Sequence, residues 1–247
     1  GRCNVAPTVC VGKNYVDEAN FDKVKKTIDE KTFDPFIPDY INLSSYKKNG
    51  GYEIANKIKN GVISKKQVLD SLNESGLKGK GGAGFPTGKK WEIVSNYNGK
   101  KYVAVNGDEG EPGTFKDRSY LESDPHRFLE GALIASYFIN AQKVYIYMRD
   151  EYPTVIKILL DEINKMENEE IIPKEFFIVR RGAGAYICGE ESAMIESIEG
   201  KRGLPRHRPP YVAEIGLFGC PTLTNNLETL FWVRDIIEKG AKWFAEK

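Results

Sequence analysis

The chain has 247 residues, 40% of them hydrophobic and 11% aromatic, which is enough apolar material for one large or two smaller globular domains. With 36 basic and 35 acidic residues the net charge is +1, so neither nucleic acid nor an anionic membrane is favoured as the main partner. No run of 18 or more apolar residues occurs, which argues against a membrane-spanning helix, and the start shows no signal-peptide pattern.

Residues 1–35 are predicted to be the end of a small domain. Residues 9–11 (Val-Cys-Val) favour a short strand, and Asn20 is placed to cap a helix that carries Phe21, Val24 and Ile28 on one face. The stretch 31–45 is richer in proline, aspartate and serine, which is typical of a linker.

The cysteines are too sparse for the disulfide framework of a small secreted protein, which favours a cytoplasmic location. They are Cys3, Cys10, Cys188 and Cys220. Because no Cys-x-x-Cys pair occurs, neither a zinc site nor a complete iron–sulfur site is expected from this chain alone. The chain begins at Gly1 without Met and shows no closing pattern at its end, so we expect it to be a piece of a longer protein.

Two short helices are predicted between residues 50 and 76. Ile54, Ala55 and Ile58 share a face of the first. In the second, Ser64 and Gln67 have the spacing of a capping box, and Gly76 is a stop signal. A further helix is expected to begin near Lys89.

Six glycines lie between Gly76 and Gly88, and a run so rich in glycine loses much conformational entropy when it becomes ordered. Phe85, Pro86 and the lysines Lys80, Lys89 and Lys90 argue against a plain flexible linker. We interpret this glycine loop as a support for a flat, anionic cofactor. A cluster of structural turns is an equally good interpretation of the glycines taken alone.

From about residue 90 the apolar runs alternate between strand and helix patterns. Strands are expected at 101–106, 143–148 and 175–180, and helices at 125–140, 153–166, after 191 and from about 225, with an irregular stretch at 201–221. This order predicts an α/β fold, a Rossmann-like parallel sheet with helices on both faces. Ligands bind such sheets at the carboxyl ends of the strands, where the loops 106–113 and 181–191 should converge.

The two kinds of charge in these loops suggest different contacts. Loop amides, the helix start near Lys89 and a lysine among Lys80, Lys89 and Lys90 could hold a phosphate, although each lysine could equally be a solvated surface charge. The acidic loop carries Asp108, Glu109 and Glu111, which could accept hydrogen bonds from ribose or ribityl hydroxyls or bind a hard cation. A solvent-facing turn is the alternative.

Other polar residues near the strand ends also have two interpretations. Asn106 is placed to contact an amide-like ring edge. Glu190 and Glu191 precede a helix and could simply cap it, and Asn225 and Asn226 are either caps or ring contacts. Cys188 fits a small buried side chain rather than a nucleophile. Neither His126 nor His207 has a serine or cysteine in a hydrolase pattern, so no catalytic triad is predicted.

Four motifs in register resemble the FMN- and NADH-binding subunit of respiratory complex I and its soluble relatives, over about residues 60–247. The motifs are residues 79–88 (GKGGAGFPTG), 106–113 (NGDEGEPG), 182–191 (GAGAYICGEE) and 224–229 (TNNLET). Residues 113–118, 125–130, 190–202 and 208–211 most resemble the beta subunit of soluble NAD-dependent formate dehydrogenase. The diaphorase subunit of NAD-linked hydrogenases follows closely.

The start of the chain fits the same resemblance. Residues 1–7 (GRCNVAP) are similar to the end of the thioredoxin-like [2Fe–2S] domain of fused family members. The implied domains are a remnant of that domain at 1–35, a linker and lead-in helix at 36–60, and an FMN- and NAD(H)-binding domain at 61–247. Cys3 would be the last of four cluster ligands, and would hold metal only with the upstream domain present. The family's C-terminal [4Fe–4S] region is absent.

Carried onto matching positions, the resemblance assigns residues to two nucleotides. Those assigned to FMN are Gly79, Lys80, Gly81, Gly82, Lys90, Asn106, Asp108, Glu109, Gly110, Tyr186, Gly189, Glu190, Asn225 and Asn226. Those assigned to NAD are Phe85, Glu111, Glu191 and Tyr211, with Glu190 also nearby. The chain departs from the family at Lys80, where many relatives have arginine, and a bidentate phosphate contact is lost with that change.

The implied activity is hydride transfer from nicotinamide C4 to flavin N5, after which iron–sulfur clusters take single electrons. Expected partners are the iron–sulfur and catalytic subunits of a multisubunit oxidoreductase, with no nucleic acid and no direct membrane insertion. The favoured context is formate dehydrogenase. Complex I and a hydrogenase diaphorase are the alternatives, and an interaction fragment with vestigial loops is the alternative without enzyme activity.

Overall fold

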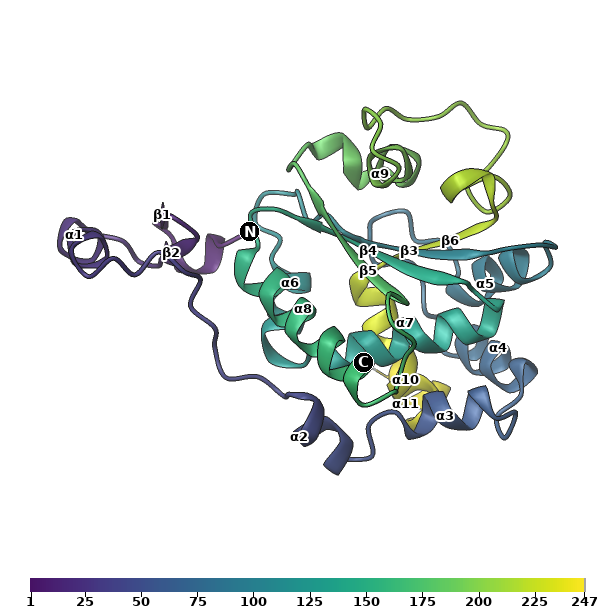
Figure 1. Cartoon of the computed structure of the whole chain (residues 1–247). Helices are drawn as coiled ribbons and strands as arrows, with labels where there is room; N and C mark the ends of the chain where they lie inside the picture. Colours follow the sequence, from purple (N-terminus) through teal and green to yellow (C-terminus); the bar gives the residue numbers. More distant parts are fainter. Residues whose placement is uncertain (247) are drawn as a thin grey trace.

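The computed structural model describes residues 1–246, and its centre is a four-stranded parallel sheet (Figure 1). Its strands are β3 (Tyr102–Gly107), β4 (Lys143–Arg149), β5 (Phe177–Gly182) and β6 (Thr222–Asn226). They lie in the order β5-β4-β3-β6, with Tyr102 opposite both Lys143 and Thr222. The sheet therefore changes direction of winding between β3 and β6, which is where doubly wound folds bind their ligands.

The strands form because their residues suit a sheet that is covered on both faces. Along β3, Val103 and Val105 belong to one apolar core, while Ala104 belongs to another. The same alternation separates Ile146 from Tyr147 on β4. Side chains of consecutive strand residues point to opposite faces, so near-continuous apolar runs fill both cores.

Most helices cover one face of the sheet or flank that layer. They are α2 (Leu43–Lys48), α3 (Glu53–Lys59), α4 (Lys65–Glu74), α5 (Thr87–Ser95), α6 (Lys116–Ser123), α7 (Pro125–Ile139), α8 (Pro153–Asn168), α10 (Leu227–Lys239) and α11 (Ala241–Ala245). The closest approach joins α7 to α10, where a Cβ on Gly131 would lie 1.9 Å from the Leu230 carbonyl oxygen. Only glycine allows these two helices to pack at that distance.

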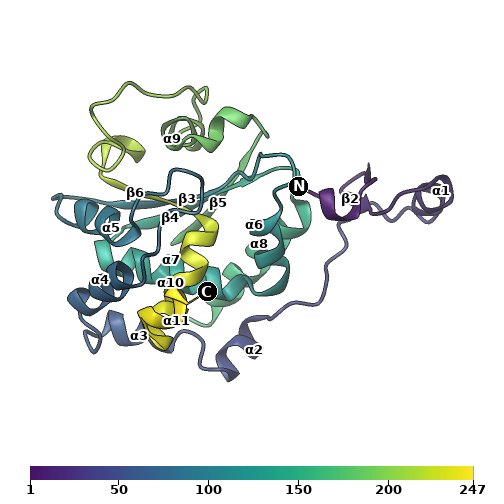
Figure 2. The same ribbon diagram turned by 180° about the vertical axis from the view of Figure 1, so that it is seen from behind.

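The opposite face carries an α-helix, short 3-10 turns and a long irregular segment. This helix is α9 (Glu191–Ile198), and we call residues 201–221, which cross over it, the strap. Figures 1 and 2 both place α9 and the strap on the far side of the sheet from α7, α8 and α10. The prediction of a Rossmann-like parallel sheet with helices on both faces is confirmed, with the two faces unequally covered.

The first part of the chain projects away from this body (Figure 1). It contains β1 (Val9–Val11), paired antiparallel with β2 (Asn14–Val16), and α1 (Phe21–Asp29). The predicted Asn20 cap is present, because its side chain accepts a hydrogen bond from the Lys23 amide at 2.8 Å. The apolar face of α1 is uncovered: Phe21 is 79% exposed.

Several elements differ from the sequence predictions. The strand β6 was not predicted: it begins just after the expected irregular stretch and includes the residues where a helix start was expected, near 225. The helix α6 and the short α2 were not predicted either. The helix expected near Lys89 begins at Thr87. The predicted capping box of α4 is confirmed, with Ser64 and Gln67 bonded reciprocally. Within residues 1–246 no helix is both long and apolar enough to cross a bilayer.

Candidate functional site

A pocket of about 460 Å³ lies beyond the carboxyl ends of β3 and β6. This volume is within the range of about 300–1,000 Å³ that is usual for small-molecule sites. Its lining residues come from the glycine loop, the acidic loop, the start of α6, the loop before α9 and the end of β6. They are Lys80, Gly81, Gly82, Asn106, Asp108, Glu109, Gly110, Glu111, Thr114, Lys116, Asp117, Tyr186, Ile187, Gly189, Glu190 and Asn226.

The structure thus brings together twelve of the residues that the resemblance assigned to the nucleotides. The other six do not line this pocket: Gly79, Phe85, Lys90, Glu191, Tyr211 and Asn225. Of these, Phe85 is 43% exposed and Tyr211 is 58% exposed.

The glycine loop is held by contacts behind it, so its backbone is free to face the pocket. The Lys80 amide donates to Thr229 Oγ1 at 3.0 Å, and the Gly79 amide donates to the Phe85 carbonyl at 2.9 Å. Gly82 has a φ of +103° and nothing lies within 4 Å of the position that a Cβ would take. A flat ligand could therefore lie directly against this part of the backbone.

The two asparagines at the strand ends use their side-chain amides inside the protein. Asn106 donates to the Gly189 carbonyl at 2.9 Å and accepts from the Asp108 amide at 2.9 Å. Asn226 donates to Asp117 Oδ2 at 3.0 Å and accepts from the Glu228 amide at 3.0 Å, so it is also the cap of α10. In this arrangement they join β3, β6 and the loop before α9.

Asp108 differs from the other carboxylates of the pocket. Its Oδ2 atom is buried and has no hydrogen-bond partner among residues 1–246. Burial raises the pKa of Asp108 to about 6, although the charge of Arg149 opposes the shift. A buried polar atom without a partner is costly, so this atom is available to a ligand.

Glu109, by contrast, faces inward and is only 6% exposed. Its carboxylate accepts from the Asp117 amide at 3.0 Å and from the Tyr152 hydroxyl at 2.9 Å. These contacts place a negative charge at the first turn of α6, where the helix dipole favours it. In this structure the Glu109 side chain is bonded to the start of α6, and only part of its surface lines the pocket.

At the pocket mouth Tyr186 and Glu111 form a pair. The Tyr186 hydroxyl donates to Glu111 Oε1, and this hydrogen bond raises the pKa of Tyr186. The Tyr186 ring is 66% exposed and passes beside Gly110, where a Cβ would lie 3.4 Å from the ring. The ring therefore forms an accessible wall at the entrance.

Lys90 lies outside the lining and is already paired. Its ammonium group is 3.0 Å from Glu191 Oε2 and 2.7 Å from Thr224 Oγ1. Burial alone would raise the pKa of Glu191, but Lys90, Thr224 and Arg208 together lower it. For Lys90 to contact a phosphate as expected, its ammonium group would have to leave Glu191 or contact both groups at once. The neighbouring Asn225 accepts a hydrogen bond from the Trp91 indole at 3.0 Å and is 6% exposed.

Glu190 connects the pocket with the strap. One carboxylate oxygen accepts from the Ser192 and Ala193 amides, both at 3.0 Å, and so caps α9, while the other pairs with Arg208 of the strap.

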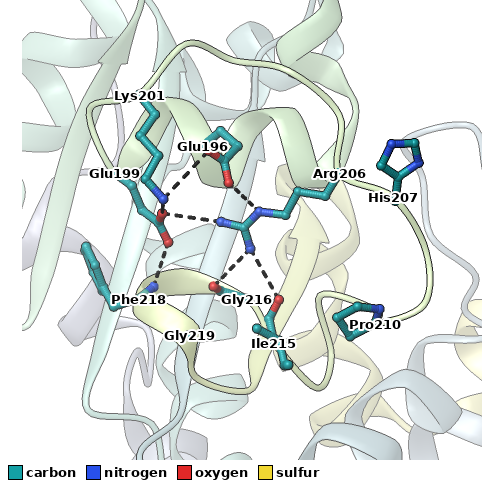
Figure 3. A pocket seen from close by; sticks show the side chains of 10 residues that line it. All are labelled: Glu196, Glu199, Lys201, Arg206, His207, Pro210, Ile215, Gly216, Phe218 and Gly219. Atoms are coloured by element: carbon teal, nitrogen blue, oxygen red, sulfur yellow. Dashed lines mark hydrogen bonds and ion pairs between the residues drawn. The ribbon is translucent and has the colours of Figure 1, made fainter.

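The strap is fixed in turn by Arg206. Figure 3 shows the Arg206 guanidinium between Glu196 and Glu199 on one side and the Gly216 carbonyl on the other, at 3.2 Å from that oxygen. A hollow of about 550 Å³ opens around this network. The guanidinium is bonded to protein groups on both sides, so the residues around this hollow connect α9 to the strap.

Sequence reasoning did not assign four of the lining residues: Thr114, Lys116, Asp117 and Ile187. Lys116 Nζ lies 2.7 Å from Asp117 and 3.1 Å from Glu228, so it joins α6 to α10. Burial raises the pKa of Asp117 to about 6, against the opposing charge of Lys116. The motif at 113–118 was the available signal, because it follows the acidic loop directly.

Cys3, which was predicted as a metal ligand, does not line the pocket. It is exposed in the short 3-10 turn Cys3–Val5. Among residues 1–246 no three His, Cys, Asp or Glu side chains are grouped so as to hold a metal ion. The ligand role of Cys3 depends on a domain outside these residues and stays a prediction.

Comparison with known proteins gives three findings. The model of the Nuo51 FMN-binding domain family matches residues 72–235. A subunit of the NADH-quinone oxidoreductase of Aquifex aeolicus (strain VF5) is 47% identical over 211 residues, which cover 82% of this chain and 49% of that protein. The corresponding subunit of Rhizobium meliloti (strain 1021) is 46% identical over 217 residues, covering 84% of this chain and 51% of that protein.

A solved NAD⁺-reducing [NiFe]-hydrogenase in the H2-reduced state has the same fold, with a TM-score of 0.81 and 32% sequence identity. The match covers 96% of this chain and 44% of the hydrogenase chain. This chain therefore spans about half the length of the curated relatives it matches.

Proposed function

This chain belongs to the Nuo51 FMN-binding domain family, and from that premise we propose that it binds FMN between β3 and β6 and transfers a hydride between FMN and NAD(H). The observation that carries the proposal is the convergence of the glycine loop, the acidic loop and the loop before α9 on one pocket at the point where the sheet changes winding. That position is the expected ligand site of a doubly wound sheet.

The residues present fit FMN. Gly82 leaves open space for a flat ring, and Gly81 already approaches Asn226, with 3.3 Å between a built Cβ and the Asn226 Cβ. The unpartnered Asp108 Oδ2 can exchange a hydrogen bond with a polar edge of the ligand. Lys80 and Lys116 supply the positive charges of the lining. Either can approach a phosphate group, although Lys116 would do so while bonded to Asp117.

FMN, when bound, supplies the hydride chemistry and the passage to single electrons. The residues of this chain position the bound FMN and shield it from water. The glycine loop allows close approach, Asp108 offers a polar contact, and Asn106 and Asn226 keep the strand ends in register. The Tyr186–Glu111 pair stands where a second nucleotide would enter, and the relatives described above are named for NADH or NAD⁺.

The proposal is tested by FMN binding to the purified chain. Gly82→Ala and Gly99→Ala are matched variants, because both glycines have positive φ and open space beside them, but only Gly82 lines the pocket. Both changes strain the backbone by about 1 kcal/mol. We expect Gly82→Ala to weaken FMN binding about tenfold and Gly99→Ala to leave it unchanged. Equal affinity in both variants would place the flavin elsewhere.

The finer context we propose is the diaphorase part of an NAD-dependent formate dehydrogenase, working with iron–sulfur and catalytic subunits. The motifs at 113–118 and 208–211 support this choice, while the quinone oxidoreductase relatives and the hydrogenase support the alternatives. The activity of the isolated native assembly distinguishes the formate dehydrogenase context from the two alternatives. Formate-dependent NAD⁺ reduction supports the formate context. An assembly that instead reduces quinone or oxidises hydrogen contradicts it.

We also propose that residues 1–35 belong to a thioredoxin-like domain whose remainder lies upstream. The support is physical: α1 buries none of its residues, and a two-stranded sheet such as β1–β2 is marginal without further packing. The test is a longer protein that includes the upstream residues. If Phe21 and Ile28 stay accessible to solvent in it, this domain assignment is contradicted.

A further inference from the structure

Another cavity, apart from the hollow around Arg206, lies at the end of the sheet opposite the proposed flavin pocket. Its volume is about 470 Å³. Its lining includes Ala141, which precedes β4, and Phe176, which precedes β5, so it stands at the amino ends of the strands. The central strands β3 and β4 are six and seven residues long, which separates the two sites by roughly 20 Å. Figures 1 and 2 show α3 and α4, whose ends border it, on the side of the molecule away from α9.

The cavity combines an apolar floor with basic side chains and has no acidic lining residue. Ile58, Ile63 and Phe176 supply apolar surface. Lys59 and Lys65 also line it, and neither forms an ion pair within residues 1–246, whereas the adjacent Lys66 pairs with Asp70 at 2.6 Å. Lys59 lies over the ring of Tyr137, with 5.9 Å from its ammonium nitrogen to the ring centroid.

A third lysine adds positive charge nearby. Lys101 is 8% exposed, no ion pair or hydrogen bond of its ammonium group occurs within residues 1–246, and its nitrogen is not among the buried atoms that lack a partner. Its aliphatic stem is therefore covered while its charged end reaches the surface. Burial and the charge of Lys101 together lower the pKa of Lys65, so the positive field reaches the cavity lining.

We propose that this cavity binds a small organic anion, a ring that carries a carboxylate or phosphate group. The charged group lies between Lys59 and Lys65 and balances the field of Lys101, while the ring packs on Ile58, Ile63 and Phe176. Such a combination of apolar surface and a few convergent polar groups is typical of small-molecule sites. This site is separate from the proposed flavin function and does not depend on it.

The test is calorimetric titration with phenyl phosphate, with FMN and NAD⁺ present in excess so that any nucleotide site is filled. We expect phenyl phosphate to bind and uncharged benzyl alcohol to bind at least about tenfold more weakly. Lys65→Met should weaken phenyl phosphate binding about tenfold, and Lys59→Met should act alike. Lys66→Met is the matched control, because it removes a neighbouring charge outside the lining, and it should leave the affinity unchanged.

A second measurement uses Lys101→Met, which removes this charge and keeps a side chain of similar length. Phenyl phosphate should raise the unfolding temperature of this variant less than that of the parent chain, because the Lys101 charge acts on the cavity lining. The proposal is overturned if the parent chain binds no phenyl phosphate at about 10 mM, a concentration that reveals even weak sites. It is also overturned if Lys66→Met loses as much affinity as Lys65→Met.

Discussion

Asp108 is the residue of the proposed flavin pocket, the pocket beyond β3 and β6, whose contacts point most directly to a ligand. Its neighbour Glu109 has a hydrogen bond to each carboxylate oxygen, whereas Asp108 keeps one buried oxygen without a partner among residues 1–246. Such an atom destabilises the protein unless a ligand satisfies it. We therefore interpret Asp108 as a residue kept for binding rather than for stability, in contrast to Glu109.

The raised pKa of Asp108, about 6, gives a pH-dependent prediction. A folded pKa above the unfolded value means that the folded state binds the proton more tightly, so stability is lost as pH rises through about 6. Asp108→Asn should thus stabilise the ligand-free chain at pH 7.5 by about 1 kcal/mol, a discounted figure because the side chain is partly exposed.

Thermal unfolding at two pH values checks this prediction. The gain of Asp108→Asn over the parent chain should shrink as the pH falls through about 6 and disappear below 3.8, the ordinary pKa of the carboxyl, where Asp108 is protonated in both the folded and the unfolded chain. Asp117→Asn is the control, because Asp117 has a similarly raised pKa but bonds to Lys116 and Asn226, so its replacement should destabilise. A gain from Asp108→Asn that is equal at both pH values would contradict the assignment.

At the scale of elements, the strap is held mainly through Arg206. The guanidinium contacts two carboxylates of the α9 region and two carbonyls of the strap (Figure 3). The next arginine, Arg208, forms an ion pair with Glu190. Because Glu190 caps α9 and lines the proposed flavin pocket, the Arg208–Glu190 ion pair links the strap to the pocket.

Arg206→Met should release the strap while the sheet stays folded. We expect chymotrypsin to cleave after Tyr211 or Phe218, both exposed, about tenfold faster than in the parent chain, because local opening becomes easier. Arg202→Met is the matched control, since no side-chain hydrogen bond or ion pair of Arg202 occurs within residues 1–246. Equal cleavage rates for the two variants would show that Arg206 does not hold the strap.

The elements also show where sequence patterns suffice and where they fail. The apolar runs of β3, β4 and β5 predict strands because both faces of a parallel strand are buried. The strand β6 escapes this pattern because it is short and ends in Asn225 and Asn226, which look like a helix cap and indeed include one. The helix α6 also escapes the sequence patterns, because most of its residues are charged or polar and it has no apolar run.

The flavin pocket was predictable as a convergence of loops, but its internal bonding was not. The carboxyl ends of parallel strands must meet at one edge, so the loops after β3 and β5 were expected together. Which amide pairs with which carbonyl depends on contacts between residues such as Asn106 and Gly189, which are far apart in the chain. For that reason the inward roles of Asn226 and Glu109 could only come from the structure.

At the scale of the whole molecule, residues 1–30 are an appendage. Their contacts with the main body include Arg118, which donates to the Gly1 carbonyl at 3.0 Å and to Asn4 at 2.7 Å, and the Arg2–Glu122 ion pair at 3.7 Å. Apart from Val16, no hydrophobic side chain in this segment is buried. The flavin pocket draws none of its lining from it.

Removal of residues 1–30 should therefore leave FMN affinity within about twofold of the parent chain and shift the unfolding temperature by only a few degrees. The physical reason is that little apolar surface is lost with the segment. Differential scanning calorimetry and a flavin titration of the shortened chain check this expectation. A shortened chain that loses its cooperative unfolding transition would show that the appendage is part of the core.

We propose that this chain carries FMN where NADH can reduce it. The most direct measurement adds NADH anaerobically to the FMN-loaded chain and follows the visible absorbance of the flavin. We expect one NADH to bleach one FMN and ferricyanide to restore the colour. A chain that binds FMN but whose colour is unchanged by excess NADH, or a chain that binds no FMN, would contradict it.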